Sequence, residues 1–266
     1  MTTLTLTKHH GLGNDFLVVF HPPSVDLAAL ARRLCDRRRG IGADGLLVGE
    51  SADGHAARMV LYNADGSRAE MSGNGIRCFG QALAMRRGDL DPQRVLTDAG
   101  ERTLVFEPTD RADTVMAAVD MGEVTDIGEP ADWARIGCDP LRPVRHLSMG
   151  NPHSVVGVEA VRDVDLELLG GVVPYVNLEI VEPGPEPHAI TMRVHERGAG
   201  ITEACGTGAC ASAWAAHQWG LVAALDGEIV VHMDGGSARV RLDAPSPGRV
   251  TLIGPAQFIA TLEVEL

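Results

Sequence analysis

An internal repeat constrains the fold of this chain more than any other feature of its sequence. The segment Ser72-Gly73-Asn74-Gly75 runs into an Ala- and Leu-rich stretch, and Cys205-Gly206-Thr207-Gly208 runs into another. Their first residues are 133 positions apart, which is half of the chain length of 266. A second match pairs Gly13-Asn14-Asp15 with Gly150-Asn151-Pro152, in the same order. Two matches in preserved order predict a duplicated domain.

The expected secondary structure divides in the same way. Hydrophobic patterning predicts helices at Asp26–Arg38, Gly75–Arg87 and Gly206–Trp219. The expected strands are Leu4–Leu6, Phe16–Phe20, Met59–Tyr62, Thr103–Phe106, Val115–Met121, Ser154–Val158, Val176–Val181, Ile190–His195, Glu228–Met233, Ser237–Leu242, Val250–Ile253 and Phe258–Val264. The polar stretch Thr109–Asp113 lies between the two groups of elements and is the expected domain boundary.

Charge limits the partners of the chain. The formal net charge is −13, and a nucleic acid or an anionic membrane would require a basic face, so neither is an expected partner. The dense basic run ends the first expected helix, where cations interact favourably with the helix dipole. It consists of Arg32, Arg33, Arg37, Arg38 and Arg39.

The sequence also favours a cytoplasmic protein. No apolar run reaches the ~18 residues typical of a membrane span. Residues Met1–His10 lack the charged-then-apolar order of a signal peptide. The five cysteines are irregularly spaced and indicate neither a disulfide framework nor a zinc site.

Cys205 lies where a reactive thiol is expected. A helix N-terminus exposes unpaired N–H groups and the positive end of the helix dipole, and glycines let a ligand approach those groups closely. Such a loop binds carboxylates and lowers the pKa of a cysteine from about 8.5 toward neutral. We therefore expect Cys205 to form a thiolate readily and to be the most easily alkylated cysteine.

The repeat extends this chemistry to a second loop. If the loops at Ser72 and Cys205 face each other across a domain cleft, the carboxylate of a small amino acid can meet amides from both. Its α-carbon then lies between an acid and a base, which can invert the centre. The amides would stabilise the carbanion, and no metal or cofactor is required.

Other motifs give weaker signals. Gly11-Leu12-Gly13-Asn14 lacks the third glycine of a dinucleotide fingerprint, and the histidines show no metal-ligand spacing. His153 stands out because it follows Asn151-Pro152, although turn capping would also explain it. For Glu196 and Arg197, which precede Gly198 at a strand end, a surface ion pair is the alternative to a binding role.

Six segments together resemble the diaminopimelate epimerase family and occur in the family's order over nearly the whole chain. They are Lys8-His9-His10-Gly11-Leu12-Gly13-Asn14-Asp15-Phe16, Tyr62-Asn63-Ala64-Asp65-Gly66-Ser67, Gly73-Asn74-Gly75-Ile76-Arg77-Cys78, Met149-Gly150-Asn151-Pro152-His153, Glu196-Arg197-Gly198-Ala199-Gly200 and Ala204-Cys205-Gly206-Thr207-Gly208-Ala209-Cys210.

The resemblance implies a fold and an activity. The fold is α/β with mixed sheets, in two pseudo-symmetric domains that each wrap a sheet around a central helix. Residues 1–112 with the returning strand 257–266 would form one domain, and residues 113–256 the other. The activity is the conversion of LL- to meso-2,6-diaminopimelate for lysine and cell-wall synthesis, by a homodimer without a cofactor, with the substrate in the cleft between the domains.

The resemblance also implies roles for individual residues. Cys205 is one of two acid–base thiols, and His153 lies near the other catalytic position. Glu196 and Arg197 hold the distal amino-acid end, with Glu196 also near Cys205. The substrate-binding amides are Asn14, Asn63, Asn151 and Asn177, and the two anion-binding loops contain Gly73, Asn74, Gly206 and Thr207.

Two positions depart from the family pattern. The family has a cysteine immediately before Gly73, where this chain has Ser72, and a serine hydroxyl is a far weaker acid than a thiol. Cys78 is more than a turn into the helix and cannot easily substitute. Gly45 replaces a glutamine that touches the substrate in many relatives.

Two alternatives follow from these departures. One is a one-base dehydratase or isomerase related to the proline racemases and the phenazine-pathway isomerases. The other is a non-catalytic, natural or engineered, form that binds and traps an amino acid.

Overall fold

The computed structural model describes residues 3–266, which form two compact units. The first unit extends to Val119 and also contains Gly254–Leu266, whereas the second contains Asp120–Ile253. The sequence places these boundaries after residues 112 and 256, so residues 113–119 and 254–256 lie in the other unit from the one expected. Residues 1 and 2 of the expected first domain lie outside the described residues.

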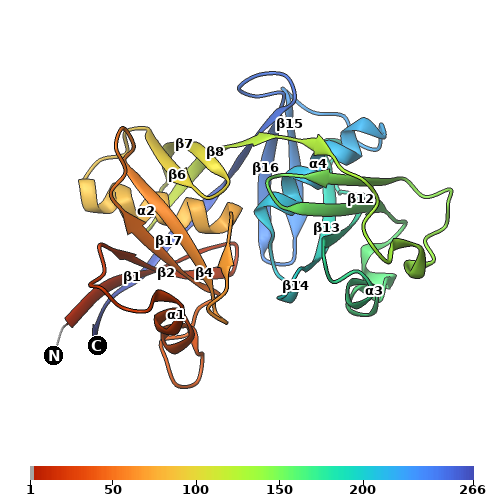
Figure 1. Ribbon diagram of the computed structural model, residues 1–266. Helices are drawn as coiled ribbons and strands as arrows, with labels where there is room; N and C mark the ends of the chain where they lie inside the picture. Colours follow the sequence, from red (N-terminus) through yellow and green to blue (C-terminus); the bar gives the residue numbers. More distant parts are fainter. Residues whose placement is uncertain (1–2) are drawn as a thin grey trace. The chain divides into compact units, whose positions relative to one another are not determined.

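The first unit contains two helices and most of the first eight strands (Figure 1). Its elements are β1 (Thr3–Gly11), β2 (Asn14–Phe20), α1 (Leu27–Cys35), β3 (Gly45–Glu50), β4 (Ala57–Asn63), β5 (Arg68–Ala69), α2 (Gly73–Arg87), β6 (Gln93–Thr97), β7 (Gly100–Pro108) and the first part of β8 (Thr114–Glu123).

The second unit repeats this plan. Its elements are β9 (Thr125–Asp126), a 3-10 turn at Trp133–Ile136, β10 (Val144–Ser148), β11 (Pro152–Gly157), a 3-10 turn at Val161–Asp163, α3 (Leu166–Val172), β12 (Asn177–Pro183), β13 (Ala189–Glu196), β14 (Gly200–Thr202), α4 (Gly206–Gln218), β15 (Glu228–Met233), β16 (Gly236–Leu242) and the first part of β17 (Arg249–Glu265).

The strand pairings of the two units correspond one to one. In the first unit β2 lies parallel to β3, β3 antiparallel to β4, and β4 parallel to β6. In the second unit β11 lies parallel to β12, β12 antiparallel to β13, and β13 parallel to β15. The expected mixed α/β fold with two repeated halves is confirmed.

Each unit contains one helix that is enclosed on nearly all sides. In α2 every residue from Gly73 to Ala84 is buried, and in α4 every residue from Gly206 to Ala213 is buried, as are Ala215 and Ala216. The sequence of α4 consists mainly of Gly, Ala, Ser and Cys, whose small side chains let surrounding strands approach closely. A helix without a polar face belongs in a core, and here it forms the centre of its unit.

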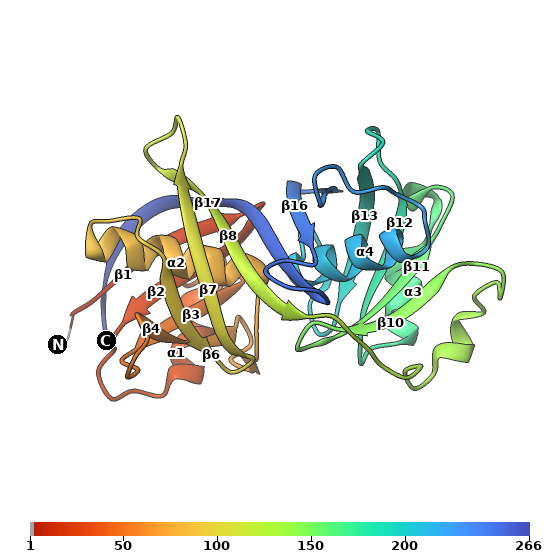
Figure 2. The ribbon, with the colours of Figure 1, turned by 90° about the horizontal axis from the view of Figure 1, so that it is seen from above.

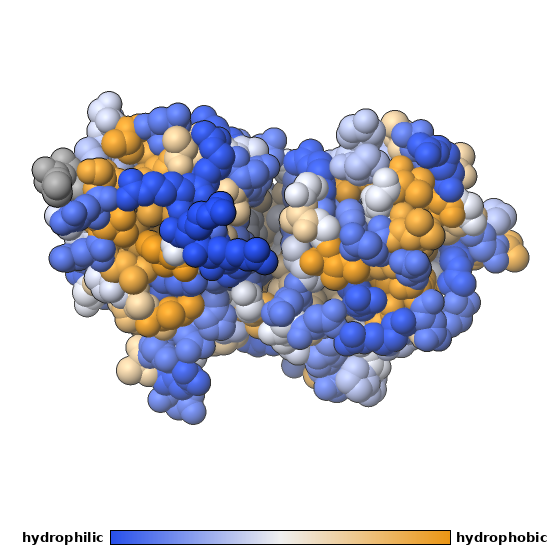
Figure 3. Space-filling model, turned by 90° about the horizontal axis from the view of Figure 1, so that it is seen from below, coloured by the Kyte–Doolittle hydropathy of each residue, from blue (hydrophilic) through white to orange (hydrophobic). Residues whose placement is uncertain are grey.

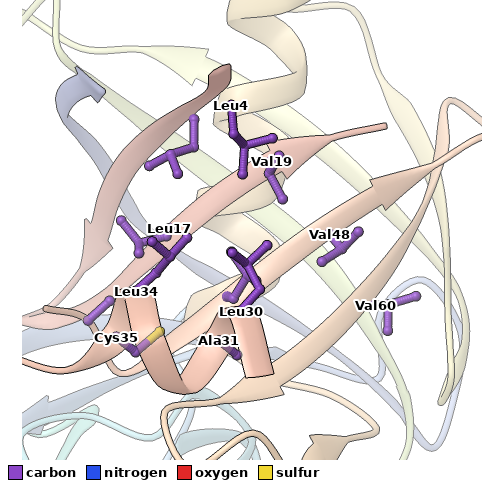
Figure 4. Close-up of a cluster of buried hydrophobic side chains, with 12 residues drawn as sticks. Leu4, Leu17, Val19, Leu30, Ala31, Leu34, Cys35, Val48 and Val60 are labelled. Carbon is purple, nitrogen blue, oxygen red and sulfur yellow. The ribbon is translucent and has the colours of Figure 1, made fainter. Parts of the chain in front are cut away.

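The other helix of each unit covers the outer face of the sheet. In the first unit α1 contributes Leu30 and Leu34 to a cluster with Leu17 and Val48 (Figure 4). Leu47, next to Val48, points the opposite way and contacts the α2 side at Gly75. Alternation along β3 therefore supplies apolar side chains to both helices. In the second unit α3 packs with strands β11 and β12 in the same manner.

Three expectations about the elements need correction. The first helix ends at Cys35, because the Asp36 carboxylate accepts hydrogen bonds from the N–H groups of Arg38 and Arg39 and starts a turn. The expected strands Val250–Ile253 and Phe258–Val264 are one strand, β17. Helix α3 was not expected, since its seven residues are too few for a clear helical period.

Two strands carry the chain between the units. The chain leaves the first unit along β8 and returns along β17 (Figure 2). Strand β17 pairs with β16 through Ile253 and with β1 from Gln257 onward. The face in Figure 3 carries hydrophilic and hydrophobic patches interspersed on both units. Within residues 3–266, no helix has the length and apolar character required to cross a membrane.

Candidate active site

Cys205 caps the N-terminus of the central helix α4. Its backbone is extended, with φ −125° and ψ 113°, and its Sγ accepts a hydrogen bond from the Gly208 N–H at 3.3 Å. The Thr207 hydroxyl lies 3.5 Å from the same sulfur. The side chain is buried, with 4% of its surface exposed. The thiol is therefore held in one orientation at the start of the helix.

The surroundings of Cys205 oppose a thiolate. Burial raises the pKa of the thiol well above its usual value, and the carboxylates of Glu196 and Glu179 raise it further. The Thr207 hydroxyl and the Gly208 N–H act in the other direction but are outweighed. The expectation of a lowered pKa is therefore wrong, because one backbone N–H at a helix start cannot offset the loss of water and two nearby carboxylates.

A buried His–Glu pair lies beside this loop. His153 of β11 and Glu179 of β12 are both fully buried, and Nδ1 of the histidine is 2.6 Å from Oε1 of the glutamate. The second carboxylate oxygen, Oε2, is also buried and has no hydrogen-bond partner. Burial raises the pKa of Glu179, against the opposing effect of His153. The short contact between Nδ1 and Oε1 therefore contains a proton that either atom can carry.

Hydrogen bonds connect the pair to the thiol. Nε2 of His153 is 3.0 Å from Oδ1 of Asn151, whose Nδ2 donates to the Thr207 hydroxyl at 3.3 Å. That hydroxyl is the one that lies 3.5 Å from Cys205 Sγ. The structure thus brings Asn151, His153, Thr207 and Cys205 together in the second unit.

Sequence reasoning missed Glu179. A signal was present, since Glu179 interrupts the apolar expected strand Val176–Val181. A carboxylate within a strand that is otherwise buried is costly unless it is paired.

Asn177, Glu196 and Arg197 form a second group in the same unit. The Asn177 side-chain oxygen accepts a hydrogen bond from the Arg197 backbone N–H at 2.8 Å. Glu196, the last residue of β13, accepts one from the Thr202 hydroxyl at 2.5 Å. The Arg197 side chain is exposed, and Asn177 is buried. The β13–β14 hairpin therefore positions a carboxylate and an accessible guanidinium.

Ser72 caps α2 as Cys205 caps α4. Its φ is −138° and its ψ 123°, and its Oγ accepts a hydrogen bond from the Gly75 N–H at 3.0 Å. Serine is among the preferred N-cap residues, so this hydroxyl also stabilises the helix. Gly73 in α2 and Gly206 in α4 are the first residues of their helices.

Asn14 and Asn74 are joined in the first unit, as Asn151 and Thr207 are in the second. The Asn74 Nδ2 donates to Asn14 Oδ1 at 3.2 Å, and the Asn14 Nδ2 donates to Asp44 at 2.6 Å. Arg37 binds both Asp44 and Asp15 at 2.7 Å. Arg37 therefore follows the helix and orients the carboxylate that holds Asn14, a role that the helix-end interpretation of the basic run did not foresee.

Asn63 and Gly45 are paired residues of β4 and β3. The exposed Asn63 side chain donates to the Ser67 hydroxyl at 3.0 Å. A Cβ on Gly45 would lie only 2.8 Å from the Tyr62 carbonyl oxygen. The backbone here has no room for a larger residue unless β4 shifts.

Arg77 is another residue that sequence reasoning left without a role. Its fully buried guanidinium donates to the Gly73 carbonyl at 3.0 Å, to Asn74 Oδ1 at 2.8 Å and to the Pro255 carbonyl at 3.2 Å. It ties the first turn of α2 to strand β17. A Cβ on Gly254 would lie 3.1 Å from the guanidinium carbon, so glycine is required for this contact.

Comparison with known proteins identifies the family. The family model for diaminopimelate epimerase matches residues 6–127 and 146–259. A diaminopimelate epimerase of Desulfitobacterium hafniense is 38% identical over 281 residues, which cover 96% of each chain. One from Halothermothrix orenii is 37% identical over 97% of this chain and 96% of its own. The chain belongs to the diaminopimelate epimerase family.

Solved structures show the same fold in more distant proteins. A predicted epimerase from Pseudomonas aeruginosa superimposes with a TM-score of 0.77 at 17% identity, over 99% of both chains. A phenazine biosynthesis protein of the PhzF family from Bacillus anthracis gives 0.75 at 16% identity, over 100% of both chains. The resemblance that the sequence motifs indicate is therefore confirmed for both family and fold.

Family membership gives the two capping residues their context. In this member of the family, Cys205 and Ser72 are the N-cap residues of the two buried helices. Among residues 3–266, no three His, Cys, Asp or Glu side chains are grouped so that they could hold a metal ion. Thiol, hydroxyl, imidazole and carboxylate groups are all able to accept or donate a proton.

Proposed function

We propose that this chain interconverts LL- and meso-2,6-diaminopimelate without a cofactor, by proton transfer at an α-carbon. Cys205 serves as the acid–base group on one side and Ser72 on the other. The observation that carries the proposal is the placement of Cys205 as a buried helix cap in a chain that matches the family over nearly its full length.

The proposed binding residues fall into groups according to the charged group of the substrate that each would bind. The N–H groups at the starts of α2 and α4 suit a substrate carboxylate. Glu196 and Arg197 suit the ammonium and carboxylate of the distal end, because an apolar ring would offer these two side chains no charge or hydrogen bond. The loops contribute Gly73, Asn74, Gly206 and Thr207, the amide side chains are Asn14, Asn63, Asn151 and Asn177, and His153 supports the catalytic groups.

The raised pKa of Cys205 requires a contribution from the substrate. To remove an α-proton, Cys205 must first become a thiolate, which burial and the carboxylates of Glu196 and Glu179 oppose. Diaminopimelate carries two ammonium groups. An ammonium bound near Glu196 would offset its charge and lower the cost of the thiolate. Substrate binding and thiolate formation are then coupled.

Ser72 makes the two sides unequal. A hydroxyl can hold or relay a proton but is a weak base without a strong partner. In the first unit the side chain that faces the cap glycine Gly75 is Leu47, which cannot accept a proton. We therefore expect one stereoisomer to lose its α-proton to Cys205 far more readily than the other loses its own to Ser72.

The assembly and the location are part of the same proposal. We propose a cytoplasmic homodimer, on the strength of the family resemblance and the irregularly spaced cysteines. Within residues 3–266, which include all five cysteines, none forms a disulfide. Light scattering of the purified protein at several concentrations measures the mass, and a single monomer mass throughout would refute the dimer.

Stereochemical analysis of the product tests the function. Purified protein is incubated separately with LL- and meso-diaminopimelate, and the isomers are separated by chiral chromatography. We expect both reactions to reach the same mixture, with no absorbance band of an aldimine in the active protein. Binding of either isomer without interconversion would instead indicate a non-catalytic form. Loss of water from a β-hydroxy amino acid would indicate a one-base dehydratase.

A further inference from the structure

The hydrogen bonds around His153 fix one of its protons. Asn151 uses its Nδ2 to donate to Thr207, so its Oδ1 is the atom that faces His153 Nε2 at 3.0 Å. An amide oxygen only accepts, and Nε2 must therefore carry a hydrogen. The other nitrogen, Nδ1, faces Glu179 Oε1 at 2.6 Å. One further proton lies in this short contact.

That proton has two possible positions with the same total charge. On Nδ1 it gives an imidazolium beside a carboxylate, and on Oε1 it gives a neutral imidazole beside a carboxylic acid. The two groups are fully buried, which favours the neutral form more than water would. The two forms differ in whether Glu179 carries a negative charge.

Glu179 is close enough to Cys205 for this difference to matter. A Cβ placed on Gly208 would lie 2.6 Å from Glu179 Oε1 and 3.2 Å from Cys205 Sγ, so the two atoms flank the same small space. Glu179 Oε2 is buried and has no hydrogen-bond partner, so its charge is poorly compensated there. In a medium of low dielectric a carboxylate at this range repels a thiolate strongly.

We propose that Glu179 is a positioning residue that adjusts the charge beside Cys205 by exchanging a proton with His153. When Cys205 becomes a thiolate, the His153 Nδ1–H bond breaks and an Oε1–H bond forms on Glu179. When Cys205 regains its proton, the transfer reverses. No proton enters or leaves the pair, and a thiolate and a Glu179 carboxylate never coexist. This role rests on the proposed function of Cys205 as an acid–base group.

The first unit supports the assignment by contrast. Leu47 is equivalent to Glu179, because each is the third residue of its strand to pair with the neighbouring parallel strand. Phe16 likewise holds the place of His153. The apolar pair accompanies a serine cap and the ionisable pair accompanies a cysteine cap. The remaining charged group that faces Cys205 is Glu196, from β13, and it stays a carboxylate in this scheme.

The variant Glu179→Gln tests the proposal. Glutamine removes the charge and cannot receive the proton, so the thiolate of Cys205 should form at lower pH. We expect the pH midpoint of Cys205 alkylation, followed at its peptide by mass spectrometry, to fall by at least about one unit. The acid limb of kcat/KM for the stereoisomer that Cys205 deprotonates should move by the same amount. A merely structural role would lower the rate without moving the limb.

The matched control is Glu186→Gln. Glu186 forms another His–Glu pair, with His232 at 2.8 Å, on the surface of the same unit. This variant should leave both the alkylation midpoint and the rate profile unchanged. If Glu179→Gln gives the same midpoint as this control, the proposal is wrong.

A measurement on the unmodified protein covers the case in which Glu179→Gln does not fold. The ¹⁵N chemical shifts of His153 report which ring nitrogen carries a proton. As Cys205 ionises, Nδ1 should change to the unprotonated type while Nε2 stays protonated. An imidazolium signal that persists alongside the thiolate would overturn the proposal. Neither this titration nor the alkylation requires turnover, so both remain informative if the epimerase assay fails.

Discussion

The two units share one scaffold but differ in the chemistry placed on it. Strand pairings correspond throughout, and each central helix begins at a capping side chain that accepts a hydrogen bond from the N–H three residues on. Around the first cap the equivalent positions hold Leu47 and Phe16, and around the second they hold Glu179 and His153. The last residue of the matching strand is Asn63 in the first unit and Glu196 in the second.

This difference separates what the fold requires from what the reaction requires. Both units need small residues in the central helix and a capped N-terminus, because both enclose that helix in a sheet. The second unit places the ionisable His153 and Glu179 beside its cap, where the first unit has Phe16 and Leu47. Buried ionisable groups carry a desolvation penalty, so their retention in one copy of a repeated core indicates use rather than stability.

The largest expected effect comes from removing the thiol. Cys205→Ala should lower the rate of interconversion by at least about a hundredfold, because positioned acid–base groups contribute on that scale. The matched control Cys138→Ala changes a partly exposed cysteine and should leave the rate unchanged. Chiral chromatography of the product measures both. Full activity of Cys205→Ala would remove the chemical distinction between the units.

Acid should destabilise the first unit by protonating His9, a buried histidine outside the catalytic groups. Burial lowers the pKa of His9 to about 4, although the hydrogen bond with Gln81 opposes this. The unfolded chain binds the proton near pH 6.5, so stability is full above that pH and falls as the pH drops to about 4. The loss should approach about 3 kcal/mol.

Urea denaturation at a series of pH values measures this loss. In His9→Gln the free energy of unfolding should vary less between pH 6.5 and about pH 4. These are the pKa values of His9 in the unfolded and the folded chain. An unaltered pH dependence in this variant would show that another group is responsible.

A pair of glycine substitutions compares the space at the two caps. In Gly208→Ala the new methyl would lie 2.6 Å from Glu179 Oε1, whereas in Gly75→Ala it would lie 3.1 Å from Ser72 Cβ. The first should cost about 2 kcal/mol of unfolding free energy through overpacking, and the second less than about 1 kcal/mol, since alanine favours the helix. Urea titration measures both. Equal losses would mean that Glu179 does not crowd this loop.

The smallest effect should come from making the caps alike. Ser72→Cys should raise the epimerisation rate at least about tenfold, equivalent to about 1.4 kcal/mol of barrier. In heavy water the unmodified protein should exchange the α-proton of one stereoisomer with retention, and that of the other much more slowly. Equal exchange from both stereoisomers, with no gain in the variant, would mean that Ser72 is a competent base.

The sequence predicted the elements that carry a clear period or a strong cap. The helices after Ser72 and Cys205 begin within two residues of their expected starts, since a polar cap and glycines mark them. The repeat likewise indicated a duplicated domain, and the family resemblance implied the mixed sheets. Residues that contact each other within one motif were also placed together, as were Asn151 and His153 in Asn151-Pro152-His153.

What could not be predicted depends on contacts between distant segments. The raised pKa of Cys205 arises first from burial, which only the complete sheet provides. The carboxylates of Glu196 and of Glu179, 26 residues before the cysteine, raise it further. Arg37 was expected to interact with a helix end, but it binds Asp15, 22 positions earlier. A local pattern contains neither the partner nor the dielectric surroundings of a charge.

Strand β17 has a consequence for how the protein is made. The first part of β17 pairs with β16. Its residues from Gln257 to Glu265 pair with β1, the first strand of the described chain. These residues are synthesised after the whole of the second unit, so the first unit cannot complete its sheet until the second has been synthesised. Domains usually fold in the order of their synthesis, N-terminal first. Here the first unit begins to be synthesised first but completes its sheet last. The edge of β1 that pairs with β17 therefore stays unpaired while the second unit is translated.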